Sequence, residues 1–275
     1  MTISSDIANT IVDPRAYADG DRVDQAFAKL RKEQPLDVAQ PEGFDPFWVV
    51  TRHADILEVE RQNELFHNGD RSTVLTTIDA DKKVREMMGG SPHLVRSLVQ
   101  MDNPDHMAYR RLTQGSFVPQ NLRVLETRIR EIAKGFIDRM VEKGEECDFA
   151  RDVAFLYPLH VIMEVIGVPE SDEPRMLKLT QELFGSADPE LNRTGSDIQD
   201  TNTGVDTIQS VVMDFMMYFN AMTEDRRANP RQDLATVIAN GQVNGQPLGH
   251  LEAMSYYIIA ATAGHDTTSS TTAAA

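Results

Sequence analysis

Hydrophobic residues recur along most of this 275-residue chain at the three- and four-residue spacing of amphipathic helices. The clearest case lies within residues 121–140, where these positions hold Val124, Leu125, Ile129, Ile132, Ala133, Phe136, Ile137 and Met140. This spacing predicts a helix whose apolar face packs on a core. Further helices are predicted at 53–66, 153–166, 173–185 and 205–220, and Gly167 with Pro169 gives the helix at 153–166 an ordinary C-terminal stop.

A different pattern near the start of the chain predicts a small amount of β-structure. Two β-rich runs, Leu36–Val38 and Phe47–Thr51, are separated by a segment rich in proline and glycine, which favours an antiparallel pair. Residues 1 to about 30 are expected to form a loose lead-in with a short helix. The fold class expected is therefore mainly α with a small β-sheet region, in one domain.

The last predicted helix begins near Leu251, after Asn-Gly turns at 240–241 and 244–245. It continues through Thr267 to Ala275 without the glycine, basic residues or proline that usually end a helix. We therefore expect the helix to continue beyond this sequence. The domain would then be a single incomplete one over residues 1–275, with β-structure at about 30–75 and helices at about 76–275.

Composition narrows the class of protein. The net charge of −16 disfavours nucleic acid as a partner. The single cysteine, Cys147, excludes an intrachain disulfide and favours a reducing compartment. The N-terminus lacks the pattern of a signal peptide, and the apolar run at 253–264 is shorter than the roughly 20 residues of a membrane span. We expect a cytoplasmic protein without a membrane anchor.

Two polar motifs could carry chemistry. In the segment Asp102–Arg111, capping residues and Pro104 predict a helix start, which places His106 and Arg110 one turn apart on one face. Such a pair can hold a carboxylate, because arginine forms forked hydrogen bonds with it. A well-capped surface helix with exposed polar residues would give the same pattern.

The second motif is Ala263-Gly264-His265-Asp266-Thr267-Thr268, inside the last helix. Gly264 destabilises a helix interior by about 1 kcal/mol relative to alanine, which suggests a kink or close approach of a ligand. An acid beside an alcohol at such a distortion could deliver protons to a bound oxygen species. Asp266 and Thr267 could equally be ordinary groups on a helix surface.

Together and in this order, these motifs resemble those of the cytochrome P-450 superfamily of haem-thiolate monooxygenases, in its soluble bacterial form. Phe117-Val118-Pro119, the strand Phe47–Thr51 with the helix after it, and Asp233-Leu234-Ala235 agree with the resemblance, which covers essentially the whole chain. It implies that His106 and Arg110 hold a propionate of haem b. It also implies that Asp266 and Thr267 form the acid–alcohol pair that protonates dioxygen, and that Ala263 and Gly264 form the helix bulge beside it.

The resemblance also implies parts that this sequence lacks. The family's Glu-x-x-Arg helix and its Phe-x-x-Gly-x-x-x-Cys loop, which supplies the thiolate to iron, would follow Thr267. Cys147 is no substitute, because the acidic residues Glu145, Glu146 and Asp148 disfavour its thiolate. No metal ligand is therefore assigned. The alternative is a non-catalytic, truncated helical protein, a pseudoenzyme, and haem binding would separate the two.

By the same resemblance, the complete enzyme would insert one oxygen atom from O2 into a small hydrophobic molecule, with a terpenoid- or steroid-like substrate as the guess. Substrate contacts are expected at 72–99, 183–191 and 259–267. Electrons would come from NAD(P)H through a reductase and a ferredoxin-type donor. A docking surface for that donor is one interpretation of the seven basic and three acidic residues between Arg110 and Arg139, and an ordinary solvated helix face is the other.

Overall fold

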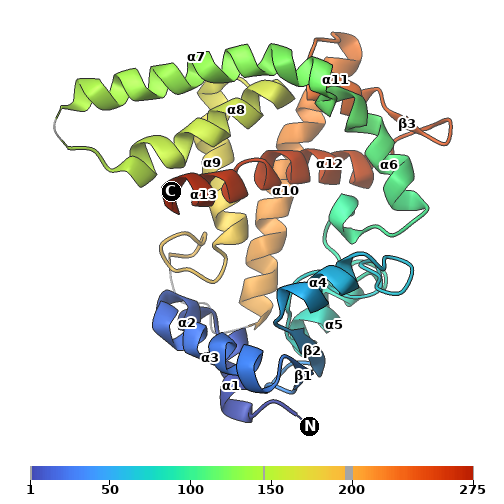
Figure 1. Ribbon diagram of the computed structural model, residues 1–275. Helices are drawn as coiled ribbons and strands as arrows, with labels where there is room; N and C mark the ends of the chain where they lie inside the picture. The colour runs from blue at the N-terminus through green and yellow to red at the C-terminus, as the bar shows by residue number, and fades with distance from the viewer. Residues whose placement is uncertain (1, 145, 196–200, 275) are drawn as a thin grey trace. The chain divides into compact units, whose positions relative to one another are not determined.

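The computed structural model describes residues 2–144, 146–195 and 201–274. Contacts divide the chain into two compact units, one formed by Met1–Leu94 with Ile198–Val205 and the other by Val95–Asp197 with Asp206–Ala275. Helices predominate in both units, and the described strands form two antiparallel pairs (Figure 1). The predicted fold class, mainly α with a small β region, is confirmed. The assignment of residues 1–275 to one incomplete domain stays a prediction.

The first unit contains the predicted antiparallel pair. Strands β1 (Leu36–Ala39) and β2 (Phe47–Val50) pair with Leu36 opposite Val50 and Ala39 opposite Phe47. Their buried faces close a small core with the helices before them. Its buried members are Ile3, Ile7, Ala8, Ile11, Ala26, Leu30, Ala39 and Val49. The two runs with high β-propensity therefore form strands, and their inward-facing side chains, Ala39 and Val49, are buried in this core.

Two expectations for this unit were wrong. The lead-in is helical, with α1 (Ser5–Val12), α2 (Pro14–Ala18) and α3 (Gly20–Glu33). Asp13 accepts a hydrogen bond from the backbone N–H of Arg15 and so caps the N-terminus of α2. Helix α4 ends at Glu60 rather than Phe66, because Leu65 and Phe66 are exposed and bury no apolar face. Helix α5 (Ile78–Met87) follows.

The second unit holds the remaining long helices. They are α6 (Asp105–Gln114), α7 (Pro119–Lys143), α8 (Leu156–Ile166), α9 (Glu173–Phe184), α11 (Leu234–Ala239), α12 (His250–Ala263) and α13 (Asp266–Ala274), together with the part of α10 (Thr201–Ala228) from Asp206 onward. The short strands β3 (Gln242–Val243) and β4 (Gln246–Pro247) form a hairpin between α11 and α12. Helix α8 follows a π-helical turn at Ala150–Ala154, and it ends as predicted at Gly167, whose φ is +94°.

Helix α12 lies in the main core of this unit and packs against α8, α9 and α11 (Figure 1). The ring of Tyr257 stacks on Phe219 of α10 with centroids 4.8 Å apart. Its buried hydroxyl donates to the carbonyl oxygen of Ala235 in α11 at 2.9 Å. A buried tyrosine that satisfies its hydroxyl in this way adds both packing and orientation, so α12 is fixed from two sides.

None of the helices within the described part of the chain is both long enough and apolar enough to cross a membrane.

Candidate functional site

Helix α6 carries the first candidate pair. His106 is half-buried and Arg110 is exposed, one turn further along the helix. Pro104 precedes the helix, after a cis peptide bond with Asn103, and Asp105 is the first helical residue. Across the described ranges, no carboxylate forms an ion pair with His106 or Arg110. These two side chains therefore remain available to an external acceptor.

The position of α6 is fixed by hydrogen bonds to α12. The hydroxyl of Tyr256 in α12 donates to the carbonyl oxygen of Tyr109 at 3.3 Å, so it accepts the hydrogen of Thr113 Oγ1 at 2.7 Å. Burial raises the pKa of Tyr256, and the nearby charge of Arg110 lowers it by a smaller amount. The polar pair on α6 is thus held beside the helix that carries the second motif.

A second link reaches α12 from the segment before α6. The backbone N–H of Arg96 donates to Ser255 Oγ at 2.8 Å, and its guanidinium donates to Glu252 at 2.7 Å and to Asp105 at 2.6 Å. Arg96 therefore contacts both helices. The sequence interpretation missed Arg96, Glu252 and Tyr256, because their partners lie far away along the chain.

The last predicted helix is interrupted at the second motif, where α12 ends at Ala263 and α13 begins at Asp266. A side-chain Cβ at Gly264 would lie 2.7 Å from Cγ1 of Ile162 in α8, which is closer than real Cβ contacts come. The absence of a side chain is thus explained by close approach to α8. The single helix expected from Leu251 to Ala275 is therefore wrong. Of the two interpretations of Gly264, a kink agrees with the interruption, and the close approach that the structure shows is to α8.

His265 anchors this break. Its side chain is buried, and its Nε2 lies 2.9 Å from the carbonyl oxygen of Phe155, so Nε2 is the protonated nitrogen of the neutral ring. Nδ1 of His265 and Oγ of Ser269 are buried without a hydrogen-bond partner in the described structure. Burial lowers the pKa of His265.

The other face of the break is open. Ala263 and Thr267 are exposed, Asp266 is half-buried, and Thr267 Oγ1 donates to the carbonyl oxygen of Ala263 at 2.8 Å. The break therefore presents an acid, an alcohol and a small apolar side chain on consecutive turns. Cys147, by contrast, lies exposed in the connection between α7 and α8. The described residues include no group of three or more metal-ligating side chains.

The basic run between Arg110 and Arg139 is partly neutralised along α7. Arg130 pairs with Glu126 at 2.7 Å and Lys134 with Asp138 at 2.6 Å, while Arg128 contacts both Glu131 and Glu164. Arg139 lies over the ring of Phe136. Three exposed arginines, Arg110, Arg111 and Arg123, have no carboxylate partner within the residues that the structure describes.

Comparison with known proteins supplies the wider context. No protein-family model matches the chain. It is 42% identical over 274 residues to cytochrome P-450-terp from a Pseudomonas species, and 30% identical over 246 residues to linalool 8-monooxygenase of Pseudomonas putida. These alignments cover 100% and 88% of this chain but 64% and 57% of the two relatives.

Solved structures agree. The crystal structure of CYP108D1 from Novosphingobium aromaticivorans superposes with a TM-score of 0.83 at 40% identity, over 98% of this chain and 62% of that one. A Mycobacterium marinum enzyme, CYP268A2, gives a TM-score of 0.79 at 25% identity. The fold is thus that of the cytochromes P-450. The chain belongs to the cytochrome P-450 superfamily and spans somewhat less than two thirds of the relatives it matches.

Proposed function

We propose that this chain is part of a haem-dependent monooxygenase that inserts one atom of O2 into a small hydrophobic molecule. The observation that carries the proposal is the break between α12 and α13, which leaves Ala263 and Thr267 on an open face beside Asp266. Similarity to a cytochrome P-450 along the whole of this chain, which covers 64% of that relative, supports it. A pseudoenzyme remains the alternative, and it predicts that the whole protein forms no oxygenated product.

The residues present fit a haem b group. Arg110 is exposed without a carboxylate partner among the described residues, as a residue that binds a propionate requires. His106, one turn away, adds a second nitrogen donor on the same face. The side chain of Ala263 is small and exposed at the break, which suits the approach of a flat ring. When bound, haem iron with a thiolate ligand supplies the activation of dioxygen.

Asp266 and Thr267 would supply protons at the site. The half-buried carboxyl group of Asp266 can exchange a proton with solvent and pass it to Thr267 Oγ1. A hydroxyl group keeps two acceptor lone pairs while it donates to the carbonyl oxygen of Ala263, so it can accept that proton and release its own. Consecutive residues of α13 carry this pair, so the two groups stay close, and closeness lowers the entropic cost of proton transfer.

A terpenoid is the substrate class that we favour. Linalool 8-monooxygenase is named for a terpenoid, and other relatives are named steroid C26-monooxygenase and methyl-branched lipid omega-hydroxylase. All three names indicate substrates with large apolar skeletons, which suit the predicted contact segments at 183–191 and 259–267.

We further propose that electrons come from NAD(P)H through a reductase and a ferredoxin-type donor, which docks near Arg111 and Arg123. These exposed arginines lack the carboxylate partners that neutralise Arg128, Arg130 and Lys134. Reversing the charge of Arg111 should slow reduction of the enzyme, most at low salt, because steering by charge is screened by ions. Unchanged reduction at every salt concentration would exclude this docking surface.

The test of the proposed function uses the full-length protein that contains this chain. Purified protein is supplied with NAD(P)H, a ferredoxin and its reductase, a monocyclic terpenoid alcohol, and isotopically labelled dioxygen. The expected result is haem in the protein and one labelled oxygen atom in the product. Haem-free protein, or a product without label, would contradict the proposal.

A further inference from the structure

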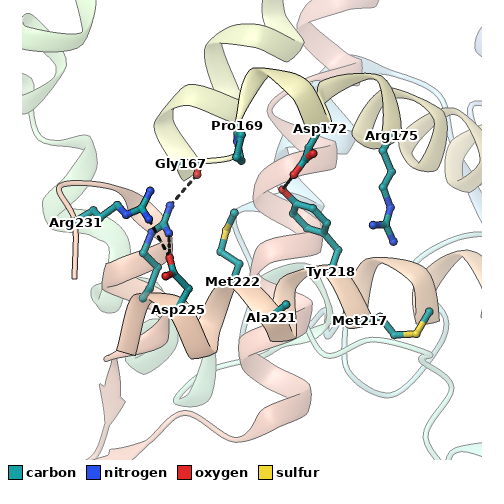
Figure 2. A pocket seen from close by; sticks show the side chains of 11 residues that line it. Gly167, Pro169, Asp172, Arg175, Met217, Tyr218, Ala221, Met222, Asp225 and Arg231 are labelled. Carbon is teal, nitrogen blue, oxygen red and sulfur yellow. Dashed lines mark hydrogen bonds and ion pairs between the residues drawn. The ribbon is translucent and has the colours of Figure 1, made fainter. Parts of the chain in front are cut away.

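The second unit, Val95–Asp197 with Asp206–Ala275, has a cavity that is not lined by residues of the break between α12 and α13. It is a groove of about 520 Å³ between the α8–α9 connection and the C-terminal half of α10. Figure 2 shows Arg175 of α9 and Tyr218 of α10 at one end and Asp225 with Arg231 at the other. None of the residues proposed to serve oxygen chemistry lines it, so the inference drawn from it does not rest on the proposed function.

The two aspartates of the groove are already engaged. Asp172 accepts a hydrogen bond from Tyr218 at 2.8 Å and another from Ser171. Asp225 is paired with Arg226 and with Arg231, the latter at 3.3 Å. Arg226 is itself buried and also contacts Asp233. The acidic groups therefore have little remaining capacity for a cationic ligand.

Arg175, unlike these aspartates, has no ion-pair partner among the described residues. Its side chain is exposed, and its guanidinium carbon lies 5.3 Å from the centroid of the Tyr218 ring. No carboxylate in the part of the chain that the structure describes forms an ion pair with it. Stacking on a ring engages the face of a guanidinium and leaves its N–H edge free for a forked bond to a carboxylate. Burial and the bond to Asp172 raise the pKa of Tyr218, which keeps this ring neutral.

The floor between the two ends is apolar. Met217 is 59% exposed beside Arg175, and Ala221 and Met222 continue the same face of α10 toward Asp225 (Figure 2). Methionine side chains are unbranched and polarisable, so they adapt to irregular hydrocarbon shapes. Met217 and Ala221 are exposed, and Met222, at 8% exposure, lines the groove beside them. An apolar surface that ends at an arginine without a carboxylate partner complements a molecule with one hydrophobic part and one negative end.

We propose that this groove binds a small monocarboxylate with a compact hydrocarbon skeleton, its carboxylate on Arg175 and its skeleton on Met217, Ala221 and Met222. Arg226 and Arg231 pair with Asp225 and Asp233, so Arg175 is the arginine of the lining without an ion-pair partner among the described residues. A positive charge at this end of the groove selects an acid over the corresponding amine.

The experiment titrates the 275-residue chain with cyclohexanecarboxylate by calorimetry and by NMR of labelled methionine methyl groups. Binding should shift the signals of Met217 and Met222 and leave buried Met254 unchanged. Arg175→Gln should weaken binding by about tenfold or more, the usual effect of losing a charge-assisted hydrogen bond. Met217→Glu should weaken it as strongly, because it supplies Arg175 with a carboxylate of its own.

Two controls make the result decisive. Arg123→Gln removes the same charge from an exposed position on α7 and should leave the affinity unchanged. Cyclohexanemethanol and cyclohexanemethylamine, which share the ring but lack the negative charge, should bind at least about tenfold more weakly. Equal binding of the alcohol, tighter binding of the amine, an unaffected Arg175→Gln variant, or no binding of the acid would each overturn the proposal.

Discussion

The guanidinium of Arg96 and the carboxylate of Glu252 meet at 2.7 Å across 156 residues of sequence. The contact joins the segment before α6 to the first turn of α12, and it is partly shielded because the Glu252 side chain is only 17% exposed. Because the backbone N–H of Arg96 also donates to Ser255 Oγ, two hydrogen bonds join this segment to α12.

Removing either Arg96 or Glu252 from this contact should lower the stability of the second unit. We expect Arg96→Met and Glu252→Gln each to reduce the free energy of unfolding by about 1 kcal/mol, the scale of a partly exposed charged hydrogen bond. Urea unfolding of both variants and the double variant measures the coupling. Asp105→Asn is the comparison, because that ion pair is more exposed and should contribute less. Strictly additive effects would show that Arg96 and Glu252 do not interact.

Gly264→Ala should destabilise the protein despite the better helix propensity of alanine. Its new Cβ would lie 2.7 Å from Ile162 Cγ1 and 2.9 Å from Cδ1. Overpacking of this kind typically destabilises a core by about 1–3 kcal/mol. Thermal unfolding measures the loss, and Ile162→Ala in the same chain should recover part of it by removing the colliding atoms. A variant as stable as the parent would mean that α8 moves aside freely.

His265 should make stability depend on pH. Burial lowers its pKa below the ordinary value of 6.5, so the folded state holds the ring neutral while the unfolded state takes up a proton. As pH falls below 6.5, the free energy of unfolding should therefore decrease until the lowered pKa is passed. His265→Gln keeps an N–H donor for Phe155 but does not titrate. Its unfolding free energy, followed from about pH 7.5 to about pH 5, should fall less steeply than that of the parent. Parallel curves would contradict the assignment.

Thr267→Ala in the full-length enzyme should separate oxygen consumption from product formation. Without the hydroxyl group, proton delivery at the helix break loses its last donor, and product per dioxygen consumed should fall by about tenfold or more. An oxygen electrode and product quantification give the two rates. Thr268→Ala is the matched control, since Thr268 is also exposed and also donates to a carbonyl oxygen four residues earlier. If both variants couple as the parent does, Thr267 has no role in proton delivery.

Arg110→Leu should weaken haem retention, because a propionate would lose a forked charged hydrogen bond. Transfer of haem to an acceptor protein should become about tenfold faster. Arg123→Leu removes the same charge from an exposed position on α7 and should not change the rate. Equal rates in both variants and the parent would remove Arg110 from the haem site.

Much of the helical framework was predictable from local spacing. The apolar period at 121–140 identified α7, and Gly167 marked the end of α8, because both signals lie within a few residues of the structure they determine. The side-chain pairs Arg130–Glu126 and Lys134–Asp138 are also local, at a spacing of four. The sequence alone therefore predicts that these two basic residues are neutralised.

The links that position α6 were not predictable. Thr113 and Tyr256 are 143 residues apart, and a single sequence gives no signal that pairs them. The same limit explains Gly264, for which sequence suggested a kink or a ligand while the structure adds the side chain of Ile162. The roles of His106, Arg110, Ala263, Gly264, Asp266 and Thr267 toward haem and oxygen stay predictions that the variants above test.

The central place of α12 has a consequence for how the protein is made. The main core includes buried residues from Leu159 in α8 to Ala261 in α12, and Tyr257 closes it against α10 and α11. A ribosome synthesises these helices in order, so α8 to α11 leave the exit tunnel before the helix that covers their apolar faces. The nascent chain therefore exposes Phe215 and Phe219 until α12 has left the tunnel, and apolar surface exposed in this way favours aggregation.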